Sequence, residues 1–288
     1  MSMSADESGE RENTYFIDPE SGAEMARLLE QDRMVTRSMG GLFSERKDMR
    51  GIKRILDIAC GPGGWALNVA ATYPDIQVVG IDISKLMIEY ARAQAYVRRL
   101  QNIRFEVQDV LQPLNFSDGS FDLINARFIV FVPRVSWSSL LQECRRLLRP
   151  GGTIRLTEAE VPITTSLAFQ RFAAKATWAF KEADCSFSPD GALYGISPVL
   201  AKLLRDAGYE NVQISADALE WSYGTENHRS FYHDHMVGMK LSHPFLIRKG
   251  AATPEELNLL YEQALQEMNA PDFCAMFIIL RAWGEKPA

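Results

Sequence analysis

The sequence lacks the patterns that mark secreted, membrane-spanning and metal-binding proteins. Its 288 residues contain four cysteines, with no C-x-x-C pair and no metal-ligand spacing, so we expect reduced thiols, a cytoplasmic location and no metal centre. No apolar run approaches the roughly 20 residues of a membrane span. Residues 1–13 are polar and acidic, where a signal peptide would be apolar. We therefore expect no membrane partner.

An excess of basic charge is also missing. The formal net charge is −6, and phosphate backbones are bound by clustered Lys and Arg, so we expect no nucleic-acid partner. The remaining composition, 47% hydrophobic and 24% charged residues, is that of a globular protein. A length of 288 residues favours one core with insertions over two domains.

Residues 55–64, Ile-Leu-Asp-Ile-Ala-Cys-Gly-Pro-Gly-Gly, are the most informative segment. They are typical of a buried strand that runs into a glycine turn, with a helix beginning at about Trp65. Gly61 and Gly63 can adopt φ > 0 and have no Cβ, so a ligand can approach the backbone closely. The helix would direct its first N–H groups and its positive dipole end at that ligand. The segment predicts a nucleotide-binding turn.

The turn alone does not identify the nucleotide. Residues 61–66 fit the dinucleotide pattern G-x-G-x-x-G/A, and Asp82 follows about 20 residues later, where that pattern has an acid for ribose hydroxyls. However, Asp57, inside the strand, is placed to help hold a cationic or ammonium-bearing ligand. No Lys or Arg lies between Arg54 and Lys85 to meet a pyrophosphate. Because backbone amides alone can bind a pyrophosphate, an NAD(P) oxidoreductase stays an alternative.

Strand and helix patterns alternate from residue 53 to residue 160. Nearly unbroken apolar strands between helices indicate a parallel sheet covered on both faces, and right-handed crossovers make it doubly wound. We expect strands at 54–59, 77–83, 103–107, 121–126 and 153–157, and helices at 65–72, 84–100 and 136–148. Further on, we expect helices at 164–183, 197–207 and 254–268, a strand from 212 and a last strand at 273–283.

The segments around this core are predicted to be largely helical. Asp18-Pro19-Glu20 is typical of a helix start. We expect one helix to about residue 30 and a second, short helix that ends at Gly40-Gly41. The chain then divides into three parts. Residues 1–50 form a disordered tail and a helical N-terminal cap, 51–160 form the nucleotide-binding core, and 161–288 supply the rest of the sheet with an inserted helical lid.

Four motifs occur in a fixed order along the core. They are Leu-Asp-Ile-Ala-Cys-Gly-Pro-Gly at 56–63, Val-Gly-Ile-Asp-Ile-Ser at 79–84, Gln-Asp-Val at 108–110 with Phe-Asp-Leu-Ile at 121–124, and Leu-Arg-Pro-Gly-Gly at 148–152. The set resembles the class I S-adenosylmethionine (SAM)-dependent methyltransferases, in particular small-molecule enzymes similar to ubiquinone and menaquinone C-methyltransferases. The resemblance covers residues 50–160 and, weakly, the last strand. It implies an α/β fold with a Rossmann-like, mostly parallel seven-stranded sheet, and SAM as the cofactor.

The resemblance assigns cofactor roles to residues at the carboxyl ends of the strands, where open α/β sheets bind ligands. Asp82 would accept hydrogen bonds from the two ribose hydroxyls, with Ile83 beside it in the same motif. Asp109 would accept from the adenine amino group, and Val110 would offer its backbone N–H to the ring. An NAD(P) fold has no reason for an acid at the position of Asp109, which favours SAM.

The methionine part of SAM would lie against the backbone of Ala59 and Gly61, with Gly63 in the same turn and Asp57 nearby. The backbone of Asn125, expected just past the fourth strand, is a further implied contact. The helical cap would add Tyr15, Arg33 and Met39. Packing is the alternative for these three cap residues, and pairing with Arg54 or backbone amides is the alternative for Asp57.

Methyl transfer from a sulfonium is an in-line displacement, so the protein mainly aligns the acceptor and excludes water. A general base is needed only where the acceptor atom, O, N or C, loses a proton. The candidates are Glu158 and Glu160 at the end of the fifth strand, then His233 and His235, for which surface exposure or cap packing is the alternative. Two histidines at i and i+2 without a third partner do not predict a metal site.

These features predict a methyltransferase that moves a methyl group from SAM to a small, fairly apolar metabolite of the polyketide, terpenoid or aromatic kind. We expect a monomer or a homodimer. A SAM-binding protein of the same fold without methyl transfer, such as a sensor, a partner subunit or an enzyme of other chemistry, is the alternative.

Overall fold

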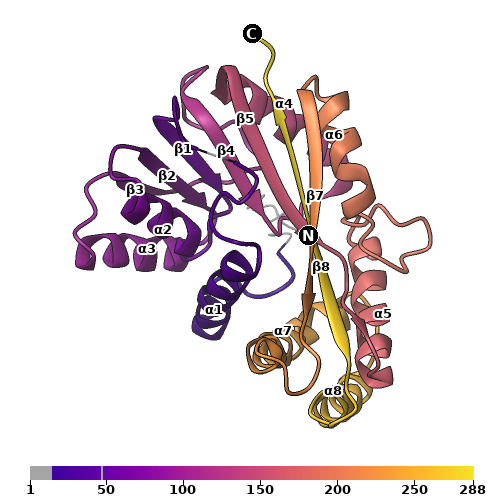
Figure 1. Ribbon diagram of the computed structural model, residues 1–288. Helices are drawn as coiled ribbons and strands as arrows, with labels where there is room; N and C mark the ends of the chain where they lie inside the picture. The colour runs from indigo at the N-terminus through magenta and orange to yellow at the C-terminus, as the bar shows by residue number, and fades with distance from the viewer. Residues whose placement is uncertain (1–14, 47) are drawn as a thin grey trace, which may run out of the picture.

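One twisted sheet organises the chain, with helices on both of its faces (Figure 1). The computed structural model describes residues 15–46 and 48–288; the disorder expected for residues 1–13 concerns residues outside this part. The strands are β1 (Arg54–Ile58), β2 (Gln77–Asp82), β3 (Ile103–Val107), β4 (Phe121–Arg127), β5 (Leu148–Ala159), β6 (Ile163–Thr164), β7 (Glu210–Glu220) and β8 (Ala275–Glu285). The helices are α1 (Gly22–Ser38), α2 (Gly64–Thr72), α3 (Lys85–Val97), α4 (Trp137–Leu147), α5 (Leu167–Glu182), α6 (Leu200–Asp206), α7 (His228–Arg248) and α8 (Pro254–Met268).

The strand order is β3-β2-β1-β4-β5-β8, and both β6 and β7 pair with β8. β1 to β5 run parallel to one another. β8 runs antiparallel to β5, β6 and β7. The doubly wound, mostly parallel α/β fold is therefore confirmed. The described sheet has eight strands rather than the expected seven. The additional one, β6, is a two-residue strand formed against β8 before the chain enters α5.

Alternate residues of the central strands enter two separate cores, which explains why the strand sequences are almost continuously apolar. Ile55 and Leu123 pack on the face that is covered by α2 and α3. Leu56 and Ile124, one position later in each strand, pack on the opposite face with α4 and α6. This double covering holds the carboxyl ends of β1 to β5 in one row.

The N-terminal cap is one helix rather than the expected two. α1 begins after Ser21, whose side chain accepts a hydrogen bond from the Glu24 amide, and not after Asp18. No glycine or proline interrupts the helix between residues 23 and 38. It ends at Gly40-Gly41, as expected, where both glycines have positive φ.

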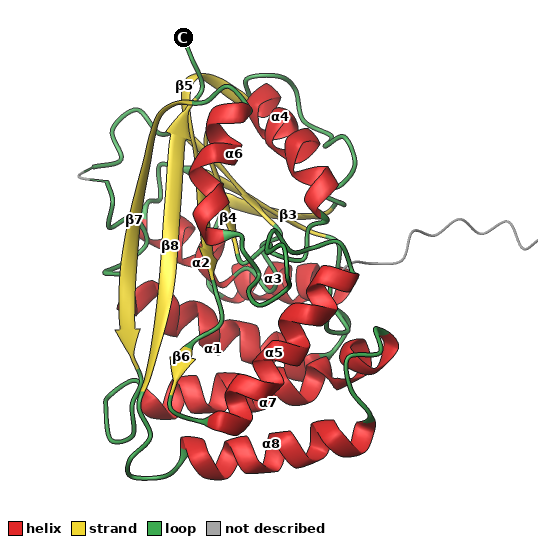
Figure 2. Ribbon diagram, turned by 90° about the vertical axis from the view of Figure 1, so that its right-hand side faces the viewer, coloured by secondary structure: helices red, strands yellow, loops and turns green. Residues whose placement is uncertain are grey.

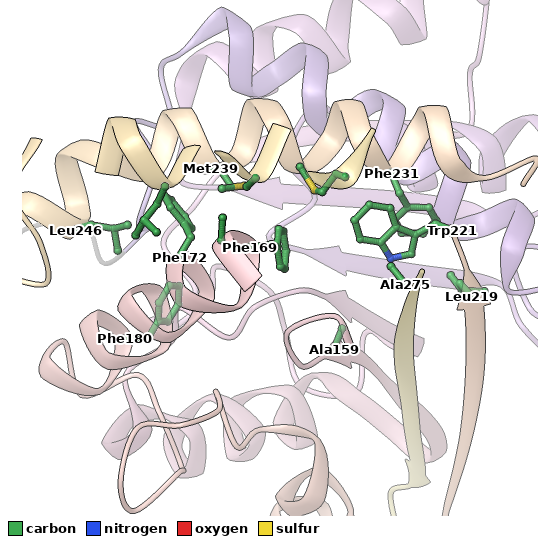
Figure 3. Close-up of a cluster of buried hydrophobic side chains, with 14 of the residues drawn as sticks. Ala159, Phe169, Phe172, Phe180, Leu219, Trp221, Phe231, Met239, Leu246 and Ala275 are labelled. Atoms are coloured by element: carbon green, nitrogen blue, oxygen red, sulfur yellow. The ribbon is translucent and has the colours of Figure 1, made fainter. Parts of the chain in front are cut away.

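Helices α5, α7 and α8, which we call the lid helices, stack at one end of the sheet (Figure 2). The sequence did not predict α7, because Pro244 lies inside it and a proline normally breaks a helix. Met239 and Leu246 nevertheless lie on the side of α7 that faces α5, and Phe231 stacks on Trp221 (Figure 3). None of the described helices has the length and hydropathy needed to cross a bilayer.

A buried ion cluster joins the cap to the lid. Arg27 of α1 donates to Glu24 at 2.6 Å and to Asp234 of α7 at 2.9 Å. The side chains of Arg27, Glu24 and Asp234 are only 7%, 0% and 8% exposed. Removing one partner of a buried pair leaves the other charge in a medium of low polarity, which is strongly unfavourable. The cluster therefore fixes α1 against α7.

Asp234→Ala should lower the free energy of unfolding by about 3 kcal/mol at pH 7, because Arg27 then keeps a buried charge with one partner fewer. Glu226→Ala is the matched control, since Arg37 and Glu226 form an exposed pair at 3.7 Å between the same regions. Loss of that pair should cost under about 0.5 kcal/mol. Chemical denaturation measures both variants. Equal losses of unfolding free energy in the two variants would show that the buried cluster does not hold α1 against α7.

Candidate active site

The glycine turn between β1 and α2 has the backbone conformation that the sequence predicts. Gly61 and Gly63 have φ of 53° and 78°, and Ala59 also has a positive φ of 51°. Gly63 is the N-cap of α2 and has no side chain to cap it, so the first N–H groups of α2 remain available to a ligand. A Cβ on Gly63 would lie 2.7 Å from the ring of Phe105. Only glycine fits at that position.

Asp82, the last residue of β2, holds this turn in place. Its Oδ2 accepts from the Gly61 amide at 2.8 Å, and its Oδ1 accepts from the Ser84 amide at 2.9 Å. Burial raises the pKa of Asp82, and these backbone hydrogen bonds oppose that rise. Asp109 follows β3 and accepts from the Leu111 amide at 2.8 Å. Each carboxylate keeps further acceptor capacity toward a ligand.

A single cavity of about 680 Å³ begins at this turn and extends to the lid. The site residues predicted from the sequence that line it are Tyr15, Asp57, Ala59, Gly61, Asp82, Ile83, Asp109, Val110, Glu158, Glu160 and His235. They come from the cap, from the carboxyl ends of β1, β2, β3 and β5, and from α7. The end of the cavity that lies at the sheet carries most of the carboxylates.

The other end of the cavity is aromatic. Phe128 and Phe131 follow β4, and side chains of the cap, α5, α7 and β8 complete this wall. Its apolar members are Phe16, Phe169, Phe172, Phe180, Tyr194, Met239, Phe245, Leu246 and Phe277. Phe169 and Phe172 of α5 lie opposite Met239 of α7 (Figure 3). This wall suits an apolar ligand next to the polar end.

Two predicted cap contacts do not line the cavity. Arg33 is exposed, and Met39 is 3% exposed within the core that α1 shares with the lid. The reason is helix phase: Leu28, Gln31 and Asp32 face the cavity, and each residue turns the side chain by about 100°. The structure does not bring Arg33 and Met39 to the cavity.

Asn125 and Gly63 also lie behind the cavity wall rather than in it. Asn125 lies inside β4, which runs from Phe121 to Arg127, and is completely buried there. The residues at that strand end which do line the cavity are Arg127 and Phe128. Gly63 shapes the turn from behind, against Phe105.

The two predicted histidines lie on different sides of α7, because residues two apart on a helix point about 200° apart. His233 is exposed and does not line the cavity. His235 lines the cavity and stacks on Phe169 with ring centroids 5.3 Å apart. Among the described residues, no group of three His, Cys, Asp or Glu side chains is placed to hold a metal ion.

Asp32 and Arg127, which were not predicted from the sequence, form an ion pair at the cavity wall with exposed fractions of 8% and 14%. Asp32 Oδ2 has no hydrogen-bond partner, although it is buried beside Gly64 at the start of α2. Arg127 is the last residue of β4. Its position at the carboxyl end of a strand was a sequence signal for a site residue, whereas no sequence pattern marked Asp32.

Residues 55–152 match the family model described as a methyltransferase domain. Residues 55–152 therefore carry a methyltransferase domain. The chain is 36% identical over 110 residues to demethylmenaquinone methyltransferase of Deinococcus radiodurans, covering 38% of this chain and 44% of that protein. It is 33% identical over 129 residues to malonyl-[acyl-carrier protein] O-methyltransferase of Legionella pneumophila, covering 43% of each. The chain thus spans less than half the length of these curated relatives.

Solved structures share the fold of the methyltransferase domain and its surroundings. Phosphoethanolamine N-methyltransferase 2 of Haemonchus contortus, in complex with phosphomonomethylethanolamine and S-adenosylhomocysteine, has a TM-score of 0.57 at 16% identity. The match covers 95% of this chain and 60% of that one. The YcgJ protein of Bacillus subtilis has a TM-score of 0.55 at 18% identity, covering 88% and 99%. At these identities the likeness concerns the fold.

The cavity is lined by two buried carboxyl groups with strongly displaced pKa values. Burial raises the pKa of Asp57 to about 7, against the opposing effects of Arg127 and Asn125. Burial also raises the pKa of Glu158 to about 8, although its Oε1 accepts from the Ile129 amide at 2.7 Å. Glu158 Oε2 has no hydrogen-bond partner. With this pKa, Glu158 is mostly protonated at neutral pH and becomes able to accept a proton as the pH rises toward 8.

Glu158→Gln should stabilise the folded protein increasingly as pH rises. The folded pKa of about 8 lies above the unfolded value of about 4.3, so wild-type stability is full below pH 4 and falls as pH rises toward 8. Glutamine does not titrate and can still accept from the Ile129 amide. Thermal unfolding should show similar midpoints at pH 4.5 and a variant higher by several degrees, roughly, at pH 8.5. A difference independent of pH would contradict the displaced pKa.

Proposed function

We propose that this chain transfers the methyl group of SAM to a small, neutral and largely apolar metabolite. The observation that supports this most is the continuity of the cavity. A carboxylate-lined end beside the glycine turn and an aromatic end under the lid share one space of about 680 Å³. A cofactor with a cationic sulfonium fits the first end, and an apolar acceptor fits the second.

The residues at the polar end match the donor and acceptor groups of SAM. Asp82 has acceptor capacity for the ribose hydroxyls, and Asp109 with Val110 offers an acceptor and an N–H for adenine. Ile83 is an apolar side chain 45% exposed beside Asp82, which suits a base ring. Asp57 suits the ammonium group of the methionine part. In SAM, the positively charged sulfur activates the methyl group for transfer.

The charges of the cavity favour a neutral acceptor. Two arginines line it, and both are already paired: Arg27 with Glu24 and Asp234, and Arg127 with Asp32. A phosphate or carboxylate would have to displace one of these partners and would face the remaining acids. Acceptors like the phosphorylated amine of the Haemonchus contortus enzyme are therefore disfavoured here.

Glu158 is proposed as the group that accepts a proton from the acceptor. The hydrogen bond from the Ile129 amide fixes Oε1 of Glu158. Oε2, which has no partner, is then held beside the cavity, where it can act as a base. His235 is the second candidate, but its stacking on Phe169 and its contact with Trp221 favour a packing role. Alignment and exclusion of water by the cap and lid supply the rest of the catalysis.

Calorimetry with SAM, S-adenosylhomocysteine and NAD tests the cofactor directly. SAM and S-adenosylhomocysteine should bind, and NAD should not. Asp82→Ala should weaken SAM binding by about 10- to 100-fold, since hydrogen bonds to a charged group contribute about 1.5–3 kcal/mol each. Asp75→Ala is the matched control, because Asp75 is exposed just before the opposite end of the same strand. Binding of NAD alone would reject the proposal.

Incubation with methyl-labelled SAM and a panel of acceptors tests the transfer. Label should enter neutral aromatic, polyketide or terpenoid compounds, and their phosphorylated or carboxylated analogues should react at least about tenfold more slowly. Label in none of them, with SAM bound, would favour a SAM-binding protein without methyl transfer.

With a hydroxyl acceptor, kcat should rise with pH through about 8 in wild type, and Glu158→Gln should remove that rise. An unchanged pH profile would exclude Glu158 as the base.

A further inference from the structure

Asp57 lies at one end of a row of polar side chains that crosses the middle of the sheet. Asp57 of β1, Asn125 of β4 and Arg155 of β5 are neighbours in register on adjacent parallel strands. Their side chains therefore point to the same face of the sheet. All three are buried, at 4%, 0% and 2% exposed. Polar residues in the centre of a parallel sheet are unfavourable unless each one is paired.

The hydrogen bonds of this row have only one possible direction. Arg155 Nη1 donates to Asn125 Oδ1 at 2.7 Å, and a guanidinium group can only donate. The amide nitrogen of Asn125 must then face the other way, and it donates to Asp57 Oδ1 at 2.7 Å. Arg155 thus decides the orientation of the Asn125 amide. Asn125 in turn offers Asp57 a donor and no acceptor.

The far end of the row is anchored by the segment that follows α1. Glu45 accepts from Arg155 at 2.7 Å and from Arg281 of β8 at 2.9 Å, and it is only 3% exposed. Arg281 also donates to Asp217 of β7 at 2.7 Å. Charges alternate in sign along this chain of contacts. Arg155 therefore has little freedom to turn away from Asn125.

We infer that Asn125 and Arg155 are positioning residues for cofactor binding, which hold Asp57 as an oriented carboxylate for the ammonium group of SAM. This inference rests on the proposed function. It assigns a role to Asn125 that differs from the backbone contact expected from the sequence. It also explains why a guanidinium group lies buried in the centre of β5.

Without such support Asp57 would be protonated at neutral pH. Burial raises its pKa to about 7, and Arg127, Asn125 and Arg155 all act against that rise, whereas Asp32 adds to it. Arg127 and Asp32 face Asp57 from β4 and α1, and the thiol of Cys60 lies in the turn that follows. A protonated Asp57 has no charge for an ammonium group. Cofactor affinity should therefore depend on pH in the range where Asp57 titrates.

The test compares two ligands by calorimetry between pH 5.5 and 7.5. S-adenosylhomocysteine has the ammonium group, and 5′-methylthioadenosine has the same adenosine without the amino-acid part. Their affinity ratio cancels any titration of Asp82, which faces the adenosine shared by both ligands. In wild type the ratio should rise with pH toward a midpoint near 7. The range stays below pH 8, where an α-amino group loses its proton.

Asn125→Leu removes the donor and should raise the pKa of Asp57 further, so that the affinity ratio stays low and nearly flat between pH 5.5 and 7.5. At pH 7, S-adenosylhomocysteine should then bind about tenfold more weakly, while 5′-methylthioadenosine changes less than about twofold. Arg281→Met is the matched control, because it disturbs the same Glu45 anchor without touching Asn125. It should lower the thermal midpoint and leave the pH midpoint unchanged. Equal shifts in both variants would overturn the inference.

If Asn125→Leu does not fold, Arg155→Met and Arg155→Lys provide the same test, since Glu45 keeps Arg281 as a partner. Arg155→Met should raise the pH midpoint of the affinity ratio. Arg155→Lys should raise this midpoint less, because lysine keeps the positive charge. An unchanged midpoint in both, with normal binding of S-adenosylhomocysteine by wild type, would reject the positioning role alone. Absence of S-adenosylhomocysteine binding by wild type would reject the proposed function itself.

Discussion

The hydrogen bond from the Gly61 amide to Asp82 is the interaction on which the site depends. It joins the carboxyl ends of β1 and β2 and fixes a turn that needs left-handed backbone at Ala59, Gly61 and Gly63. A carboxylate has about four lone-pair sites, so Asp82 can support the turn and still accept hydrogen bonds from a ligand. Burial makes its charge costly, and the turn amides offset part of that cost. One side chain thus fixes the local backbone geometry and keeps acceptor capacity for a ligand.

The same constraint governs the other acids of the cavity, each of which needs a donor because it is buried. Asp32 has Arg127, Asp57 has Asn125, and Glu158 has the Ile129 amide. As a result, the two arginines that line the cavity are both committed to carboxylates. The cavity is left with acceptors at one end and aromatic rings at the other, which is the arrangement a cationic cofactor and an uncharged acceptor require.

The sequence predicted the core and its turn because their signals are local. The apolar strands, the glycines and the acids after β2 and β3 all lie within a few residues of the motif that reveals them. Whether a side chain outside the core points into the cavity depends on the phase of its helix or on where its strand ends. Asp32 faces the cavity while its neighbour Arg33 faces solvent, and Arg127 ends β4 two residues after the expected Asn125. α7 was missed because Pro244 concealed its periodicity. Contacts across 200 residues, such as Arg27 with Asp234, leave no local pattern.

The most direct measurement of the central claim is a crystal structure of the protein with S-adenosylhomocysteine. The account predicts the ribose hydroxyls within hydrogen-bond distance of Asp82, the adenine amino group at Asp109, and the ammonium group at Asp57, with the sulfur directed toward the aromatic wall. A ligand bound elsewhere, or one with its amino-acid part turned away from Asp57, would contradict it.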